Sequence, residues 1–337
     1  MTTVALPRHR LIGDLAWTGV AFGLGLMTLI AFLAIAGFDV VSALEAMWRG
    51  AFGSRYAIMS ATLVRAVPLL ILGLAFALGA RAGGFNIGME GQFAAGAIAA
   101  TWVGVGLSGA PAAVALPATL AAGCIAGALW MLLPVVLRAR FGVTEVISTL
   151  LLNFVAEAAV SWAVSGPLQE AGRTYPQSDP IALAARLPRL IPSERMHAGL
   201  LLALVLAVLM AVLFRRSRAG FALRAVGAAP DAARIVGRVK VTRVLVLALL
   251  GSGALAGLGG AVEVSGVSFA LYQRLSPGYG FTAIAVALLG RLHPGMIVGA
   301  ALLFGALEAG AGAMQRDAGV PAVAVMVVQA VVLIAMV

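Results

Sequence analysis

The chain has 337 residues, of which 62% are hydrophobic and only 11% are charged, and its mean hydropathy is +1.05. Soluble globular proteins carry roughly 25% charged residues, so this composition excludes a water-soluble domain and indicates lipid as the solvent. The formal net charge of +10 could indicate a nucleic-acid partner. The arginines, however, cluster at the ends of apolar stretches, which is typical of membrane topology.

Apolar stretches long enough to cross a bilayer as helices, about 20 residues each, recur along the chain. These stretches do not alternate apolar and polar residues with period two, as the strands of a membrane β-barrel would. In lipid the hydrogen bonds of the backbone must be made within the protein, so we predict an all-α fold. The first apolar run follows Arg8 and Arg10 but is too long for a cleavable signal sequence, so we expect it to be retained. We predict a single transmembrane domain over 1–337, a polytopic helical bundle of about ten spans, at residues 14–37, 56–80, 87–107, 112–137, 145–165, 196–214, 241–262, 277–291, 294–313 and 321–337.

Two connecting segments are long enough to have a function of their own. Residues 215–243 hold eight arginines and lysines against one acid, Asp231, whereas residues 166–195 carry both signs of charge. Basic residues are enriched on the cytoplasmic side of membrane proteins. We therefore predict that the loop 215–240 and both termini are cytoplasmic and that the loop 166–195 lies outside.

Both halves of the chain contain a glycine-broken segment followed by a helix of small residues, at 81–92 and at 276–299. This similarity predicts two pseudo-repeated halves, which an odd number of intervening spans would make inverted. Glycines spaced four residues apart also let helix backbones approach closely. Such pairs are Gly123 with Gly127, Gly253 with Gly257, and Gly295 with Gly299.

The segment from Arg81 to Gln92 places glycines, amides and a carboxylate at or near membrane depth. Irregular backbone is tolerated there only where it is buried in protein or lines an aqueous cavity. We expect a broken helix beside a translocation path, with Asn86, Glu90 and Gln92 as its polar groups. The alternative is a cytoplasmic turn whose polar residues cap helices.

A second polar stripe lies on an otherwise apolar helix that Thr144 is placed to cap. Glu145, Ser148 and Asn153 fall near one face of this helix, which predicts a side that faces the path or another subunit. Hydrogen bonding between helices is the alternative. Further on, Tyr279 and Phe281 could stack on a planar or ring-shaped solute, or could simply pack where a helix starts.

Carboxylates inside a membrane are costly and are therefore functional candidates by default. The candidates are Glu90, Glu145, Glu157, Glu263 and Glu308.

Within the basic loop, Pro230 and Asp231 predict a short helix from Asp231 to Val236. Its apolar positions suggest that it docks on a cytosolic partner, although the loop could instead anchor to anionic lipid. The chain has no P-loop motif and its only lysine is Lys240, so it cannot bind ATP in that way. The single Cys124 and three scattered histidines predict no metal site, and we expect no catalytic residues.

Four stretches resemble the permease subunits of ABC importers in the ribose/branched-chain amino acid permease family, and within it the simple-sugar and nucleoside branch. The four stretches occur in the same order as in the family, and the resemblance covers the chain from about residue 56 onward. The stretches are Gly84 to Gln92, Thr144 to Asn153, Arg224 to Arg234, and Gly280 to Pro294.

This resemblance implies half of a type II importer in a bacterial inner membrane, paired with a second related permease. A cytoplasmic ATPase would bind ATP and dock on the 215–240 loop, and an extracytoplasmic lipoprotein would deliver the solute, so the permease itself needs no cofactor. The expected coupling residues are Arg224, Asp231, Arg234 and Ile235.

Asn86 and Glu90 match the family's polar break, whereas Met89 and the pair Ala228-Ala229 depart from its usual residues. These departures leave the solute open among a nucleoside, a simple sugar and another small polar molecule. The alternative function is an ion-coupled secondary transporter that uses Glu90 and Glu145.

Overall fold

The computed structural model describes residues 8–235, 240–321, 323–324, 326–327 and 330. The chain forms two compact units, Met1–Thr62 with Leu303–Val337, and Leu63–Leu302. The described residues are helical apart from connecting segments and two isolated β-bridges. The helices are α1 (Arg8–Ile35), α2 (Val40–Phe52), η1 (Ala57–Thr62), α3 (Leu63–Arg81), α4 (Met89–Gly106), α5 (Ala112–Phe141), α6 (Glu145–Ser165), η2 (Leu183–Ala185), α7 (Gly199–Arg216), α8 (Arg218–Ala228), α9 (Pro230–Ile235), α10 (Val241–Glu263), η3 (Val264–Ser268), α11 (Tyr279–Leu289) and α12 (Pro294–Asp317).

The prediction of an all-α polytopic bundle is confirmed. Fewer helices than the ten predicted are long and apolar enough to cross a membrane. Six helical segments of the described chain are long and apolar enough to cross a membrane. Helix α4 is polar in its first turn, α11 has only 11 residues, and most of the predicted span 321–337 lies outside the described residues. The six segments are Ala57–Arg81, Ala112–Phe141, Glu145–Ser165, Gly199–Arg216, Val241–Ser268 and Pro294–Asp317.

Helix α2 was not predicted and belongs to the first unit. Asp39 caps it, because its Oδ1 accepts hydrogen bonds from the backbone N–H of Val41 and Ser42. The helix packs against the second part of α12, where Gly310 approaches Met47. It has only 13 residues and contains Glu45 and Arg49, so a search for spans does not detect it.

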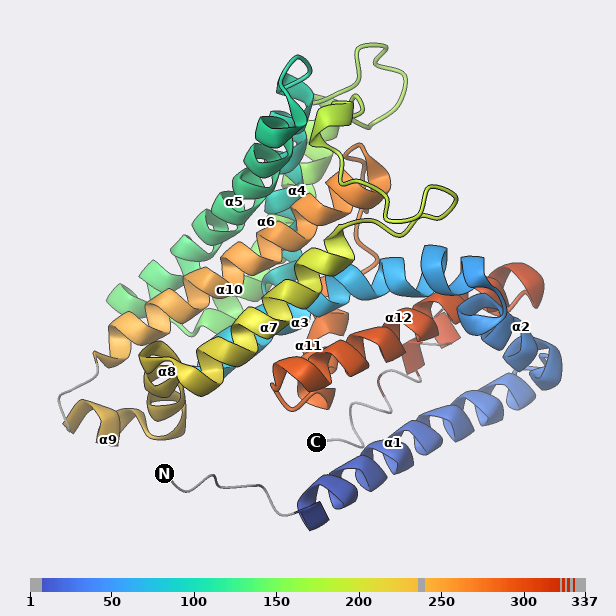
Figure 1. Cartoon of the computed structure of the whole chain (residues 1–337), viewed down its shortest axis with the longest axis horizontal. Helices are drawn as coiled ribbons and strands as arrows, with labels where there is room; N and C mark the ends of the chain where they lie inside the picture. Colours follow the sequence, from blue (N-terminus) through green and yellow to red (C-terminus); the bar gives the residue numbers. More distant parts are fainter. Residues whose placement is uncertain (1–7, 236–239, 322, 325, 328–329, 331–337) are drawn as a thin grey trace. The chain divides into compact units, whose positions relative to one another are not determined.

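The centre of the second unit is built by α4, α5 and α10, which run beside one another (Figure 1). Their backbones touch at glycines. A Cβ atom at Gly257 would lie 2.8 Å from the Cα of Gly127 and would also overlap the carbonyl of Gly123. A Cβ at Gly96 would overlap the backbone of Gly257 in turn. Two of the predicted glycine pairs therefore meet each other across one helix crossing.

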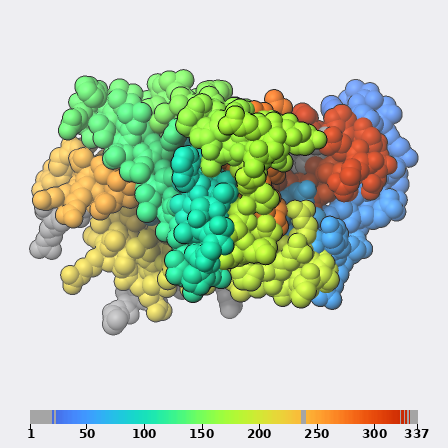
Figure 2. Space-filling model, turned by 90° about the horizontal axis from the view of Figure 1, so that it is seen from above, coloured from blue at the N-terminus to red at the C-terminus, as the bar shows by residue number. Residues whose placement is uncertain are grey.

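The long segment 166–198 packs onto the connection that follows α10 and forms part of the surface of this unit, in yellow-green in Figure 2. The backbone N–H of Ser178 donates to Leu271, and the N–H of Ile181 donates to Phe269, each over 2.8 Å. His197 is buried against Gly266, where no Cβ would fit. Burial, with a smaller effect of Arg195, lowers the pKa of His197 to about 4, so the imidazole stays neutral at physiological pH.

Candidate functional site

The two glycine-broken segments meet in the second unit. Residues 82–88 separate α3 from α4, and residues 269–278 separate η3 from α11. Glu90, in the first turn of α4, accepts a 2.6 Å hydrogen bond at Oε2 from the backbone N–H of Gly280, in the first turn of α11. The carboxylate thus lies at the positive ends of two helices. A Cβ at Gly280 would lie 2.7 Å from the Cα of Glu90, so this approach requires glycine.

A cavity of about 410 Å³ lies next to this junction. Its volume is in the range of small-molecule sites. Three of the predicted path residues line it, namely Glu90, Asn153 and Phe281. The complete lining is Glu90, Phe93, Ala94, Ala97, Asn153, Phe154, Glu157, Val160, Ser161, Leu271, Gln273, Arg274, Leu275, Ser276 and Phe281.

Glu157 and Arg274 are the charged residues of this lining that were not chosen as site residues from the sequence. Glu157 belonged to the intramembrane acids, and it lies one further step of four along the α6 stripe after Asn153, so continuing that periodicity would have found it. Arg274 lies in an irregular loop and has a left-handed backbone, with φ of 56°. No periodic signal marks such a position.

Asn86 and Gln92 are fully buried and form a pair of amides. Asn86 Nδ2 donates to Gln92 Oε1 (2.7 Å) and to Ser252 Oγ (2.9 Å), and Gln92 Nε2 donates back to Asn86 Oδ1 (3.0 Å). Asn86 Oδ1 also accepts from the N–H of Gly88. These bonds compensate for the hydrogen bonds lost where the helix breaks. A direct role of the two amides along a path stays a prediction.

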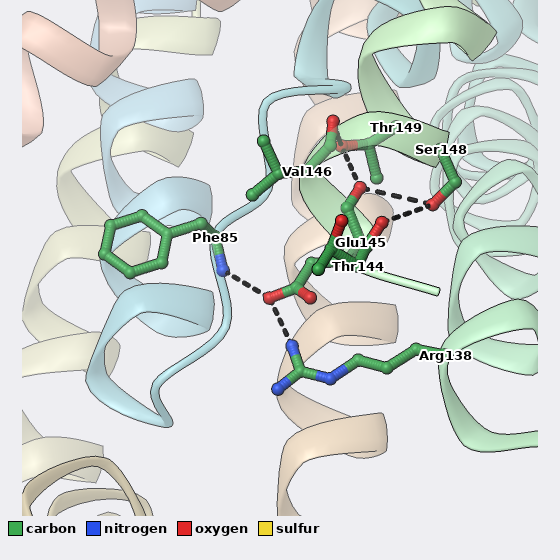
Figure 3. A network of polar contacts seen from close by, with 7 residues as sticks. All are labelled: Phe85, Arg138, Thr144, Glu145, Val146, Ser148 and Thr149. Atoms are coloured by element: carbon green, nitrogen blue, oxygen red, sulfur yellow. Dashed lines mark hydrogen bonds and ion pairs between the residues drawn. The ribbon is translucent and has the colours of Figure 1, made fainter. Parts of the chain in front are cut away.

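Glu145, at the start of α6, joins the broken segment to the last turn of α5 (Figure 3). Its carboxylate forms an ion pair with Arg138 and accepts a 3.0 Å hydrogen bond from the backbone N–H of Phe85. Ser148 and Thr149 donate their hydroxyls back to the carbonyl of Glu145. Glu145, Ser148 and Thr149 therefore make hydrogen bonds within the protein, as the alternative of hydrogen bonding between helices implies. Contact of this part of the stripe with solute stays a prediction.

Replacing Glu145 with glutamine is expected to lower the free energy of unfolding by about 3 kcal/mol, because the half-buried Arg138 loses its counter-charge. Thermal unfolding of the purified protein in detergent measures the change. The matched control is Glu45→Gln on α2, which breaks an exposed 3.9 Å pair with Arg49 and should cost less than about 1 kcal/mol. Equal melting of both variants and the parent would contradict a stabilising role for this network.

Asn153 and Tyr279 support the junction from two sides. Asn153 Oδ1 accepts from the N–H of Gly91 (2.8 Å), and its Nδ2 donates to the carbonyl of Ile87 (3.0 Å). Tyr279 is buried and meets Phe93 edge to face, with ring centroids 6.1 Å apart. Phe281 is exposed and borders the cavity, so of the two predicted aromatic residues only Phe281 lines it.

The expected coupling residues lie on two short helices near the broken segment. Helix α9 has no buried residue, and Ile235 at its end is 86% exposed. Asp231 and Arg234 form an exposed 3.4 Å pair, whereas Arg224 lies on α8. The predicted helix is present and starts at Pro230, while its expected last residue, Val236, is outside the described residues.

Helix α8 touches the broken segment directly. A Cβ at Gly227 would overlap the carbonyl oxygen of Arg81, so the two backbones are in contact. A second cavity, of about 430 Å³, lies between residues of the broken segment, α8, α9, α5 and the start of α10, and both Arg138 and Arg234 line it. The basic loop and the segment held by Glu145 therefore occupy the same region of the unit.

Comparison with known proteins decides the family. The model of the branched-chain amino acid transport system / permease component family matches residues 58–337. The chain belongs to this family. It is 40% identical over 336 residues to the glucose ABC transporter permease protein TsgB13 of Haloferax volcanii, covering 95% of this chain and 87% of that one. It is 37% identical over 318 residues to the guanosine ABC transporter permease protein NupP of Bacillus subtilis (94% and 90% covered), and 29% identical over 259 residues to NupQ of the same organism (74% and 79%).

These relatives confirm the predicted family and its simple-sugar and nucleoside branch. This family member is a multi-pass membrane protein and the permease subunit of an ABC importer. They do not support the alternative of an ion-coupled secondary transporter.

Proposed function

We propose that this permease, together with a second related permease, moves a nucleoside or a simple sugar across the bacterial inner membrane. The observation that carries this proposal is the polar cavity beside the junction of the two broken segments, centred on Glu90. Non-helical backbone at membrane depth is a feature of translocation sites in transporters. A cavity that places carboxylates, amides and aromatic rings at such a junction suits a small hydroxylated ring compound.

The names of the relatives support this class of solute. TsgB13 is named for glucose and NupP for guanosine, and both compounds combine a ring with several hydroxyl groups. Two aromatic side chains of the cavity, Phe154 and Phe281, are exposed and can lie against the face of such a ring.

The partners follow from the same relatives and from the surface of the chain. Two different permease proteins of one organism, NupP and NupQ, are both named for guanosine, which supports a pair of permeases. The basic residues of 215–240 favour a cytoplasmic location for this loop and for both termini. The exposed α9 would then contact a cytoplasmic ABC ATPase that binds the ATP, and the segment 166–198 would face an extracytoplasmic binding lipoprotein.

Uptake into proteoliposomes tests this function. The permease is reconstituted with its second permease, ATPase and binding lipoprotein, and labelled guanosine and D-glucose are offered with ATP enclosed. We expect uptake of one of them that stops when ATP is replaced by a non-hydrolysable analogue and that persists when a protonophore removes the proton gradient. Uptake without ATP hydrolysis that collapses with the gradient would contradict the proposal.

A further inference from the structure

We infer that Glu157, with the cavity around it, is a binding site for two neighbouring hydroxyl groups of the solute, a vicinal diol. This inference rests on the proposed function. It adds to it a specific residue, a specific chemical group and a selectivity that the importer should show at the level of the permease.

Glu157 lacks the contacts by which Glu145 holds elements of this unit together. It is exposed in the interior of α6, a helix of 21 mostly apolar residues. No hydrogen bond or ion pair among the described residues involves it, in contrast to Glu145 at the start of the same helix. A carboxylate facing hydrocarbon is strongly unfavourable, and Glu157 lines the polar cavity, which offers it a polar environment.

Carboxylate chemistry matches a diol. An ionised carboxylate offers two oxygens that only accept hydrogen bonds, and two hydroxyls on adjacent carbons can donate to both at once. Hydrogen bonds to a charged acceptor are stronger than neutral ones. The cavity supplies the remaining groups that a sugar ring needs. Arg274 and Gln273 can donate to ring or carbonyl oxygens, and Phe154 and Phe281 offer apolar faces.

A cation is the alternative occupant, and three features of the lining count against it. The second carboxylate, Glu90, already accepts a hydrogen bond at Oε2 from Gly280 and lies at two helix N-termini. The guanidinium of Arg274 is also in the lining and repels a further positive charge. Hard cations need several oxygen ligands, and these two carboxylates are the only acidic residues in the lining.

The test compares hydroxylated and deoxygenated solutes in the complete importer. Proteoliposomes carrying the parent or Glu157→Gln take up labelled guanosine and 2′-deoxyguanosine, or methyl α-D-glucopyranoside and its 3-deoxy analogue, with saturating binding lipoprotein. Neither deoxy compound keeps two hydroxyls on adjacent carbons. We expect Glu157→Gln to lower uptake of the hydroxylated form about tenfold, because a charged hydrogen bond is weakened. Uptake of the deoxy form should change much less. The lipoprotein's own preference cancels, because it is the same in both variants.

Glu45→Gln, which removes an exposed carboxylate on α2, is the control and should leave both rates unchanged. The inference is overturned if Glu157→Gln lowers uptake of the hydroxylated and the deoxy solute equally, as a cation site or a packing role would produce. It is also overturned if Glu157→Gln changes neither uptake rate. Each of these results leaves ATP-driven uptake by the parent intact, so the proposed function survives it. If the parent shows no ATP-driven uptake of any probe, the proposed function fails and the inference fails with it.

Discussion

Replacing Gly257 with leucine is expected to abolish folding of the permease. Gly257 is where α10 crosses α5, and a Cβ there would lie 2.8 Å from both the N and the Cα of Gly127 and would overlap the carbonyl of Gly123. Each of these neighbours is backbone, so no side-chain rotation can make room. Overpacking of a core side chain costs about 1–3 kcal/mol when neighbours can adjust, and separating three packed helices should cost more than a marginally stable protein retains.

The measurement is the amount of monodisperse protein that detergent extracts from membranes, followed by size-exclusion chromatography. Gly299→Leu is the matched control, because Gly299 is also a helix glycine and a Cβ there would meet nothing within 4 Å. We expect parental amounts for Gly299→Leu and none for Gly257→Leu. A Gly257→Leu protein that elutes and melts like the parent would contradict a direct backbone contact at this crossing.

The glycine pairs show what spacing can and cannot predict. Gly123 with Gly127, Gly253 with Gly257, and Gly295 with Gly299 share one spacing, yet only the first two pairs meet each other. Spacing places two small residues on one helix face, but which helix lies opposite is a property of the tertiary structure. The fold class, in contrast, follows from composition alone, because an apolar chain in lipid can satisfy its backbone only within helices.

Helix ends were predictable where local chemistry marks them. The span predicted at 145–165 coincides with α6, which starts directly after Thr144, although the side chain of Thr144 makes no capping hydrogen bond. The span predicted at 277–291 is shorter in the structure, because the left-handed Gly278 delays its start and Arg291 and Leu292 turn left-handed after Leu289. Arginine and leucine do not signal that backbone conformation.

The candidate site was predictable in its parts but not in its assembly. Both broken segments were visible as glycine-rich interruptions, and Glu90 was visible as a costly acid. The hydrogen bond from Gly280 to Glu90 joins residues 190 positions apart, and no local pattern encodes it. The same limit applies to Asn86, whose hydrogen bond to Ser252 joins residues 166 positions apart, and its expected place along a path stays a prediction.

Replacing Ile235 with alanine is expected to uncouple ATP hydrolysis from transport. An isoleucine that is 86% exposed at the end of a helix without buried residues contributes little to the fold of this chain. It has the character of an anchor that fills a pocket of a partner, and truncation of such an anchor typically costs about 2 kcal/mol or more of binding energy. Because Gly227 on the preceding helix touches the backbone of Arg81, displacement of this region would reach the broken segment directly.

In the reconstituted importer we therefore expect Ile235→Ala to reduce uptake more than tenfold, while ATP hydrolysis loses its stimulation by the solute-loaded lipoprotein. Leu129→Ala is the control, because it removes a similar exposed apolar side chain from the span α5 and should leave both activities unchanged. Arg234→Ala should have a weaker effect on the fold than on coupling, since its pair with Asp231 is exposed. Normal, ATP-coupled uptake in both α9 variants would show that the ATPase docks elsewhere. The contact between α8 and the broken segment would then serve stability alone.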